Sequence, residues 1–395
     1  MKKVILKPFR EKSVLKRHPW IFSGAVEKVQ GTPSPGETVL ILNYKNEPLG
    51  LGSYSPKSQI AIRIWTFDPE ERIGEGFFFK RIKRAFNLRK DLNIDDYTNA
   101  YRIVNSESDG LPGVIVDCYD NFLVCQFLSA GAEYWKKEIV SALKEIFPQS
   151  SIYERSDVLV RQKEGLELKK GVLAGDTPPD RIKIKEGDIF YWVDVKNGHK
   201  TGFYLDQREN RKETSIYFTD KRVLNCFSYT GGFGIVALKS NAKEVINIDS
   251  SAKVLELAKE NFILNSLSLD KVQFLKGNVF RFLRYFRDKG EEFDAIVLDP
   301  PKLIHSKSTF DRGLAGYKDI NLLAIKLLKT GGTLITFSCS GLLQPSMFQK
   351  VISDASIDAK KEVKIVKRLG MPCDHVVDVN FPEGLYLKGF VCKVL

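Results

Sequence analysis

The first 75 or so residues show short apolar runs separated by glycine, proline and asparagine. The runs at 34–43, 48–54 and 59–65 each have the length of a short strand, and turn-forming residues lie between them. This pattern predicts a small β-rich domain over residues 1–75.

Residues 76–187 combine helical and strand-like patterns. Phe78, Phe79, Ile82 and Phe86 lie at helical spacing with lysine and arginine between them, which predicts a helix over 76–92. A strand-like stretch follows at 113–128, then a helix over about 133–147 and further strands to about residue 185. We therefore expect a central α+β domain over 76–187.

From residue 188 onward, apolar runs alternate regularly with amphipathic helical segments. The expected strands are 222–227, 243–249, 271–275, 293–299 and 333–338, and two final strands follow. Alternation of this kind indicates right-handed βαβ units and a mostly parallel sheet covered by helices on both faces. Ligands of such sheets bind at the carboxyl ends of the strands, so the third domain, 188–395, is expected to hold its site there.

The charge of the chain favours a polyanionic partner without identifying it. The 395 residues include 61 basic and 49 acidic side chains, a net charge of +12. Residues 1–30 hold eight lysines and arginines against two glutamates, so the surplus is concentrated at the N-terminal end.

Six cysteines are scattered along the chain without a C-x-x-C pair or a histidine at ligand spacing. A zinc site or disulfide framework therefore has little support, and we expect no metal, reduced thiols and a cytoplasmic protein. The N-terminus lacks an apolar core of signal-peptide length, and no apolar run approaches the ~18 residues that span a bilayer. We expect neither secretion nor membrane insertion.

A glycine-rich segment, Ser228 to Gly234, follows the first strand of the third domain, and the next strand ends in Asp249. This arrangement is typical of a site for a nucleoside-bearing cofactor, with the carboxylate on the ribose. The letters Gly232-x-Gly234-x-x-Ala237 also match a dinucleotide fingerprint, so an NAD-dependent dehydrogenase is one alternative. Asn278, Asp299 and Cys339, each at the end of a later strand, favour S-adenosylmethionine instead.

Several motifs resemble those of the RlmI-like family of 23S ribosomal RNA cytosine-5 methyltransferases. The resemblance extends over nearly the whole chain, through RHPWIFSGAV (17–26), DGLPGVIVD (109–117), FYLDQRENR (203–211), VLNCFSYTGGF (223–233), VLDPPK (297–302), GYKDIN (316–321), FSCSG (337–341) and PEGLYLKGF (382–390). It implies a PUA domain, a small α+β domain and a seven-stranded Rossmann-like class I methyltransferase domain with an antiparallel final strand.

The resemblance also implies a set of cofactor-binding residues. They are Tyr204, Asp206, Arg208, Phe227, Ser228, Tyr229, Thr230, Gly231, Asp249, Asn278 and Asp299. Asn278 stands where many methyltransferases carry aspartate, and its side-chain oxygen can still accept from an adenine amino group.

Cys339 is the candidate nucleophile, because cytosine carbon 5 becomes reactive only after a thiolate adds to carbon 6. The alternative is that Cys339 packs as a small apolar side chain, which we expect for the other five cysteines. Lys302 is a candidate source of positive charge for the thiol. Asp299 is expected to contact the target base, with the methyl-donor site and local backbone amides as alternatives.

The expected partner is 23S ribosomal RNA or a large-subunit precursor, without a membrane partner, and a homodimer is a candidate assembly. Lys7, Arg10, Lys16, Arg17, Lys302 and Tyr317 are the candidate RNA-binding residues, and basic residues 80–84 are a secondary candidate. For Tyr317, the alternative to RNA binding is packing in the protein core. Two rival functions remain: amino-group or guanine methylation on the same scaffold, and a non-enzymatic RNA-binding assembly factor.

Overall fold

The computed structural model describes residues 1–395, which form two compact units. Unit 1 comprises Met1–Gly187, Val193–Leu205 and Cys373–Gly384, and unit 2 comprises Asp188–Trp192, Asp206–Pro372 and Leu385–Leu395. The predicted boundary at residue 187 coincides with the end of the first segment of unit 1. Two segments that the sequence assigned to the third domain, Val193–Leu205 and Cys373–Gly384, nevertheless pack with unit 1.

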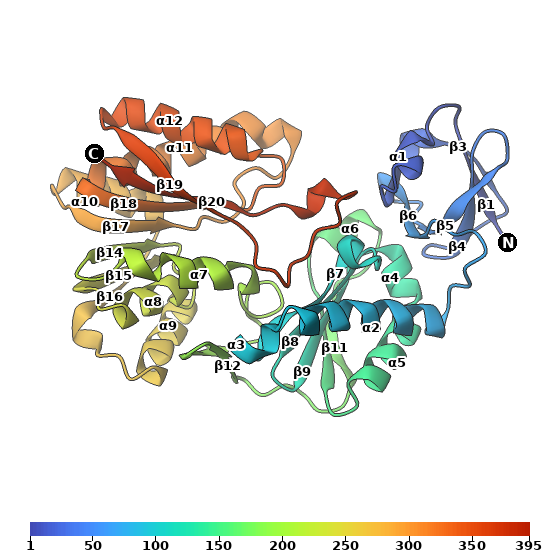
Figure 1. Ribbon diagram of the computed structural model, residues 1–395, viewed down its shortest axis with the longest axis horizontal. Coiled ribbons are helices and arrows are strands. Elements are labelled where there is room, and N and C mark those ends of the chain that lie inside the picture. Colours follow the sequence, from blue (N-terminus) through green and yellow to red (C-terminus); the bar gives the residue numbers. More distant parts are fainter. The chain divides into compact units, whose positions relative to one another are not determined.

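The N-terminal part of unit 1 is built on a six-stranded sheet in the order β2-β6-β5-β4-β1-β3 (Figure 1). Its elements are β1 (Lys3–Leu6), α1 (Lys12–Leu15), β2 (Trp20–Phe22), β3 (Val26–Gln30), β4 (Thr38–Leu42), β5 (Pro48–Tyr54) and β6 (Ile60–Thr66). Alternate residues such as Val4 and Leu6 are buried in a small core with Ile41 and Ile62. The predicted β-rich domain thus has its own sheet and its own core.

The central part of unit 1 has a five-stranded sheet in the order β11-β10-β9-β8-β7. Its strands are β7 (Ala100–Asn105), β8 (Val114–Tyr119), β9 (Phe122–Phe127), β10 (Ser151–Ser156) and β11 (Lys169–Ala174), and its helices are α2 (Glu75–Asp91), α3 (Ile94–Tyr97), α4 (Ala130–Tyr134), α5 (Lys136–Ile146) and α6 (Val160–Lys163). The helix predicted over 133–147 is therefore two helices that meet at Trp135. The buried face of α2 carries Phe77, Phe78 and Ile82, whereas Phe79 and Phe86 are only partly buried.

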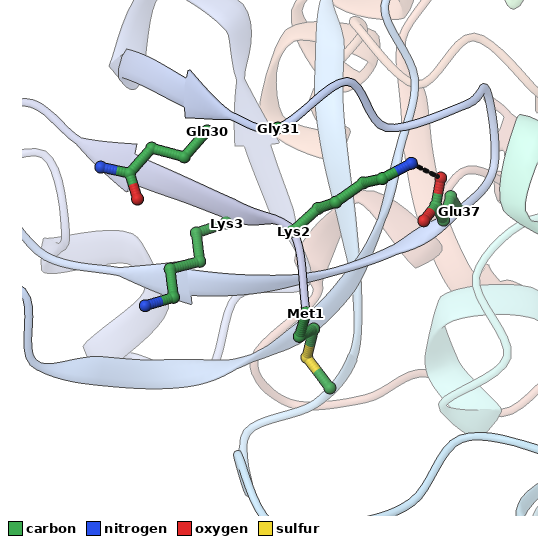
Figure 2. Close-up of a pocket in the computed structure, with 6 residues that line it drawn as sticks. All are labelled: Met1, Lys2, Lys3, Gln30, Gly31 and Glu37. Carbon is green, nitrogen blue, oxygen red and sulfur yellow. Dashed lines mark hydrogen bonds and ion pairs between the residues drawn. The ribbon is translucent and has the colours of Figure 1, made fainter.

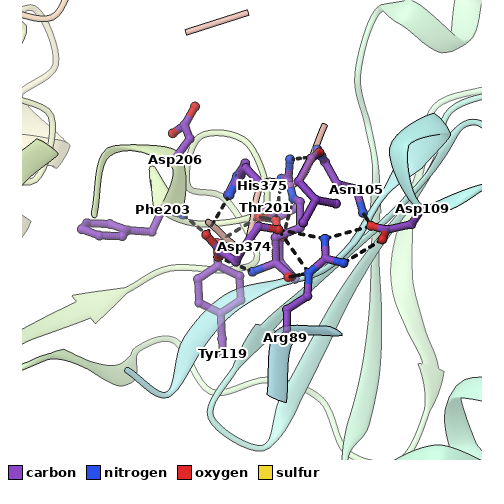
Figure 3. A network of polar contacts seen from close by, with 12 residues as sticks. Arg89, Asn105, Asp109, Tyr119, Thr201, Phe203, Asp206, Asp374 and His375 are labelled. Carbon is purple, nitrogen blue, oxygen red and sulfur yellow. Dashed lines mark hydrogen bonds and ion pairs between the residues drawn. The ribbon is translucent and has the colours of Figure 1, made fainter. Parts of the chain in front are cut away.

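Unit 1 also contains a buried network of charged and polar groups (Figure 3). Arg89 donates to both carboxylate oxygens of Asp109, at 2.7 and 2.8 Å, and to the carbonyl of Asp374 at 2.8 Å. The backbone N–H of Arg102 donates to Asp374 Oδ2 at 2.8 Å, and Asn105 Nδ2 donates to the carbonyl of Val376 at 2.8 Å. These bonds explain why the segment Cys373–Gly384 belongs to unit 1.

Unit 2 is built on a seven-stranded sheet in the order β16-β15-β14-β17-β18-β20-β19. Its strands are β14 (Arg222–Cys226), β15 (Glu244–Asp249), β16 (Val272–Lys276), β17 (Phe293–Leu298), β18 (Leu328–Ser338), β19 (Val363–Leu369) and β20 (Lys388–Val394); β12 (Ile182–Glu186) and β13 (Ile189–Val193) precede them in the chain. The strands from β16 to β18 are parallel, and β20 is antiparallel to both of its neighbours. The predicted seven-stranded, mostly parallel sheet with an antiparallel final strand is confirmed.

Helices cover both faces of this sheet, with α7, α8 and α9 on one face and α10, α11 and α12 on the other (Figure 1). Their bounds are α7 (Arg208–Thr214), α8 (Gly232–Lys239), α9 (Ala252–Leu264), α10 (Val279–Asp288), α11 (Phe310–Leu327) and α12 (Pro345–Ala359). No helix of the chain has the length and apolar character needed to cross a bilayer. Because five adjacent strands are parallel, the loops that follow them gather at one edge of the sheet.

Candidate active site

The loop between β14 and α8 is tightly wound. Phe227, Tyr229 and Gly231 have positive φ angles of 58°, 47° and 82°. Non-glycine residues in this conformation cost on the order of 1–3 kcal/mol, and such strain concentrates at functional sites. At Gly231 an added Cβ would also lie 3.1 Å from Phe262 Cε2, so both conformation and space favour glycine there.

Asp249, at the end of β15, anchors this loop. Its Oδ2 accepts a hydrogen bond from the backbone N–H of Tyr229 at 3.0 Å, and its Oδ1 accepts from Ser251 N at 3.0 Å. A carboxylate has about four acceptor positions, so lone pairs remain for ribose hydroxyls. Asp249 therefore fixes the loop and can still take the ligand contact predicted for it.

Two buried hydroxyls in the loop lack hydrogen-bond partners within the protein. Ser228 is 6% exposed and Thr230 is 2% exposed, and neither side-chain oxygen has a partner. A buried hydroxyl without a partner costs about 1–3 kcal/mol, so native proteins rarely retain one without a reason. The loop thus fits a polar ligand that supplies the missing hydrogen bonds.

The remaining predicted cofactor residues lie in different settings. Asn278 is exposed and caps α10, because its Oδ1 accepts from Arg281 N at 3.2 Å. Asp206 is buried and accepts a 2.7 Å hydrogen bond from Tyr386 OH, and Arg208 is buried at the start of α7. Tyr204 belongs to unit 1, where its OH lies 3.1 Å from His199 Nδ1. Their contacts with a cofactor stay predictions.

Cys339 directly follows β18 at the carboxyl edge of the sheet and is half-buried. The serines on either side of it are anchored by one tyrosine, because Tyr317 OH lies 2.9 Å from Ser338 Oγ and 3.0 Å from Ser340 Oγ. Ile304 N also donates to Ser340 Oγ at 3.2 Å. The thiol is thus held between two fixed residues.

Tyr317 was expected to contact RNA, with a core role as the alternative. It is fully buried, and burial raises the pKa of its hydroxyl, which hydrogen bonds from Ser338 and Ser340 partly offset. A side chain enclosed in this way does not reach an RNA base, so the structure favours the core role. Asp299 follows β17 and is half-buried at the same edge of the sheet.

Of the other cysteines, Cys125, Cys226 and Cys392 are buried as expected, whereas Cys118 is half-buried like Cys339. Burial raises the pKa of the thiols of Cys118 and Cys392 to about 12, and it raises those of Cys125 and Cys226 as well. A raised pKa leaves a thiol protonated and unreactive. Cys373 is exposed, contrary to the expected core packing, because Asp374 and His375 beside it fill the interior instead.

Lys388, at the start of β20, is a residue of this region that the sequence did not single out. It is 6% exposed, and its Nζ donates to the carbonyls of Ser340 and Leu343 at 2.6 and 2.7 Å. The residue lies within the PEGLYLKGF motif, so the motif was visible although the role of this lysine was not. It ties β20 to the turn that follows Cys339.

The basic residues predicted to bind RNA are all exposed: Lys7, Arg10, Lys16, Arg17 and Lys302. A separate hollow of about 460 Å³ in the N-terminal domain is lined by Met1, Lys2, Lys3, Gln30, Gly31 and Glu37 (Figure 2). There the charge of Lys2 is partly offset by its 2.7 Å ion pair with Glu37. Exposed cations without such partners are better suited to phosphate.

Two known families match parts of the chain. A PUA-like domain matches residues 4–67, and the S-adenosylmethionine-dependent methyltransferase family matches residues 165–390. By fold, strand-edge site and this match over more than half its length, the protein is an S-adenosylmethionine-dependent methyltransferase. The cofactor predicted from the strand-end residues is thereby confirmed over the dinucleotide alternative.

The relatives narrow the class further. The chain is 50% identical over 393 residues to the ribosomal RNA large subunit methyltransferase I of Escherichia coli strain SMS-3-5, covering 100% of this chain and 99% of that protein. The protein of the same name from Cronobacter sakazakii is also 50% identical, with the same coverage. The chain belongs to the ribosomal RNA large subunit methyltransferase I family. These names give no support to the predicted homodimer.

Solved structures show the same fold over the full length. The methyltransferase SMU.776, solved in complex with SAH, aligns with a TM-score of 0.87 and 25% identity and covers 100% of both chains. An S-adenosylmethionine-dependent methyltransferase from Streptococcus mutans aligns with a TM-score of 0.86 and 24% identity, also over 100% of both chains.

Proposed function

We propose that this protein forms 5-methylcytosine in 23S ribosomal RNA through a transient bond between Cys339 and carbon 6 of the base. The named relatives support ribosomal RNA as the substrate. The observation that carries the chemistry is the placement of Cys339, a half-buried thiol at the carboxyl edge of the sheet, between two serines that Tyr317 anchors.

The cofactor loop supplies the groups that would hold S-adenosylmethionine. Ser228 and Thr230 offer buried hydroxyls, Asp249 offers spare acceptor positions, and Gly231 permits the left-handed turn of the loop beside Phe262. Asp206, Arg208 and Asn278 are further candidates, with Phe227, Tyr229 and Tyr204. When bound, the cofactor supplies an electrophilic methyl group.

Cys339 makes the cytosine able to accept that group. The thiolate adds to carbon 6, the electron pair of the 5,6 double bond shifts to the 4,5 bond, and the π pair of the 3,4 bond moves to ring nitrogen 3, which gives an enamine whose carbon 5 is nucleophilic. After carbon 5 is methylated, loss of its proton re-forms the double bond and expels the thiolate. Asp299, half-buried at the same edge, is the candidate to hold the base by its ring nitrogen or amino group.

The substrate must present its base outside a stacked helix, at a cost of a few kcal/mol. Contacts of Lys7, Arg10, Lys16, Arg17 and Lys302 with phosphates would offset this cost, since all five side chains are exposed. We infer a cytoplasmic location, which the proposed action on ribosomal RNA supports.

Ribosomal RNA containing 5-fluorocytidine tests the proposal, because fluorine at carbon 5 blocks the last step and traps the covalent adduct. The wild-type protein is expected to form an RNA adduct with S-adenosylmethionine, and Cys339→Ala is expected to form none and to lose methylation. Cys373→Ala, which removes an exposed thiol outside the site, is the matched control and should behave as wild type.

Other outcomes would contradict the proposal. Methylation by Cys339→Ala at the wild-type rate would favour transfer to an amino group or guanine, which nucleoside mass spectrometry would identify. RNA binding without methylation by the wild-type protein would favour an assembly factor.

A further inference from the structure

Lys388 is a buried ammonium without a carboxylate partner. Its Nζ donates to the carbonyls of Ser340 and Leu343 at 2.6 and 2.7 Å, and it forms no ion pair. An ammonium has three N–H donors, so one remains after these two bonds. Burying a cation is costly unless an opposite charge accompanies it, so an anion is expected beside it in some state of the protein.

Cys339 is the group beside Lys388 that can become that anion. The Nζ of Lys388 donates at 2.6 Å to the carbonyl of Ser340, the residue that directly follows Cys339. Burial lowers the pKa of Lys388 to about 8, the charge of Cys339 raises it, and Lys302 lowers it further.

The other ionisable groups near the thiol do not offer a buried positive charge. Asp299, half-buried at the same edge of the sheet, is an acid. Lys302, from the loop after β17, is exposed, so water screens it. Tyr317, from α11, is kept neutral because burial raises the pKa of its hydroxyl, with a further contribution from Cys339. Lys388 is the buried cation of the set.

We propose that Lys388 is a positioning residue that stabilises Cys339 as a thiolate and fixes the turn that carries it. This inference rests on the proposed function, in which the thiolate is the nucleophile. Below the point at which Lys388 loses its proton, its positive charge favours the ionised thiol over the neutral one. The ordinary thiol has a pKa of ~8.5, so help of this kind is needed near neutral pH.

Alkylation of Cys339 by iodoacetamide tests the inference without RNA or cofactor. The rate is followed across pH by mass spectrometry of the peptide that contains Cys339, in the wild type, Lys388→Met and Lys388→Arg. We expect the alkylation rate of the wild type to rise with pH and to inflect below pH ~8.5, the ordinary pKa of a thiol. In Lys388→Met the inflection should move upward by about one pH unit, so alkylation near neutral pH falls about tenfold.

At alkaline pH, above both inflections, the rates of the wild type and Lys388→Met should agree. Lys388→Arg keeps the charge and should retain the low inflection. A merely structural role for Lys388 would slow alkylation at every pH or leave it unchanged, and would not move the inflection.

Two controls keep the result interpretable. The alkylation rate of the exposed Cys373, measured in the same digests, should depend on pH in the same way in all variants. Lys302→Met should shift the Cys339 inflection less than Lys388→Met, because Lys302 is exposed. Equal inflections in the wild type and Lys388→Met would overturn the inference.

If Lys388→Met fails to fold, the pH at which the wild-type alkylation rate inflects still tests the inference. An inflection at or above pH ~8.5 excludes a stabilised thiolate. Failure of the proposed function has a different signature. In that case Cys339→Ala still methylates RNA, whatever the alkylation profile of the wild type shows.

Discussion

Two buried polar regions of this protein differ in whether their groups are satisfied internally. In the central domain, Arg102 donates to both oxygens of Asp117 at 2.8 and 3.0 Å, and Thr201 donates to the same carboxylate at 2.6 Å. In the loop after β14, the hydroxyls of Ser228 and Thr230 are equally buried but have no partner. Burial of polar groups alone therefore does not mark a ligand site. Unpaired hydroxyls indicate one here because they lie in the loop at the carboxyl edge of the sheet, whereas other unpaired atoms, such as Ser55 Oγ and Thr336 Oγ1, do not.

The difference assigns separate roles to the two regions. Fully paired charges hold one arrangement of the chain, and removing one partner leaves the other buried and uncompensated. Unpaired buried hydroxyls lower stability and gain hydrogen bonds only when a ligand arrives. The following variants test this division.

The largest effect is expected from Asp117→Ala. It leaves the Arg102 guanidinium, 7% exposed, without its carboxylate, which should lower the free energy of unfolding by about 3–5 kcal/mol. Urea denaturation measures the loss. The control is Asp319→Ala, which breaks the exposed 2.7 Å pair with Arg284 and should cost less than ~1 kcal/mol. Similar losses in both variants would contradict a structural role for the buried pair.

Ser228→Ala and Thr230→Val should weaken cofactor binding without destabilising the fold, the reverse of what is expected for Asp117→Ala. Neither removes a hydrogen bond within the protein, and each removes an unsatisfied buried hydroxyl, so the free energy of unfolding should not fall and can rise by up to about 1–3 kcal/mol. Each should weaken S-adenosylmethionine binding about fivefold, the equivalent of one hydrogen bond of ~1 kcal/mol, in calorimetry. Ser338→Ala, which removes a buried hydroxyl bonded to Tyr317, is the matched control and should lose stability. Unchanged affinity in both loop variants would remove them from the cofactor site.

A pH-dependent effect concerns Glu133, another paired carboxylate of the central domain. Burial raises its pKa, but hydrogen bonds from Lys136, Lys169 and Arg161 outweigh this and lower the pKa from 4.5 to about 2. Because the folded-state pKa is the lower one, the stability that Glu133 contributes is complete above pH 4.5 and is lost as the pH falls toward 2.

Urea denaturation of the wild type and Glu133→Gln at a series of pH values tests this sign. The difference in stability between the two proteins should be largest near neutral pH and should shrink as acid protonates Glu133. A difference that stays constant with pH would show that the carboxylate charge contributes nothing.

The sequence predicted the sheet of unit 2 because its strands are long apolar runs separated by amphipathic helices, a pattern with few alternatives. It also located Asp249 and Cys339, since strand ends of a parallel sheet share an edge. The sequence did not predict that Lys388 is buried. Lysine is almost always a surface residue, and no sequence pattern distinguishes a buried lysine from an exposed one. The burial of Tyr317 was equally hidden, because a tyrosine near the middle of a helix suits core and surface alike.

The buried polar network of unit 1 includes residues near the C-terminus, which are synthesised last. A nascent chain that ends at Pro372 lacks the carbonyl of Asp374 that Arg89 uses, the carboxylate that binds Arg102 N, and the carbonyl of Val376 that binds Asn105. The central domain can therefore reach its final packing only after almost all of the chain has been translated.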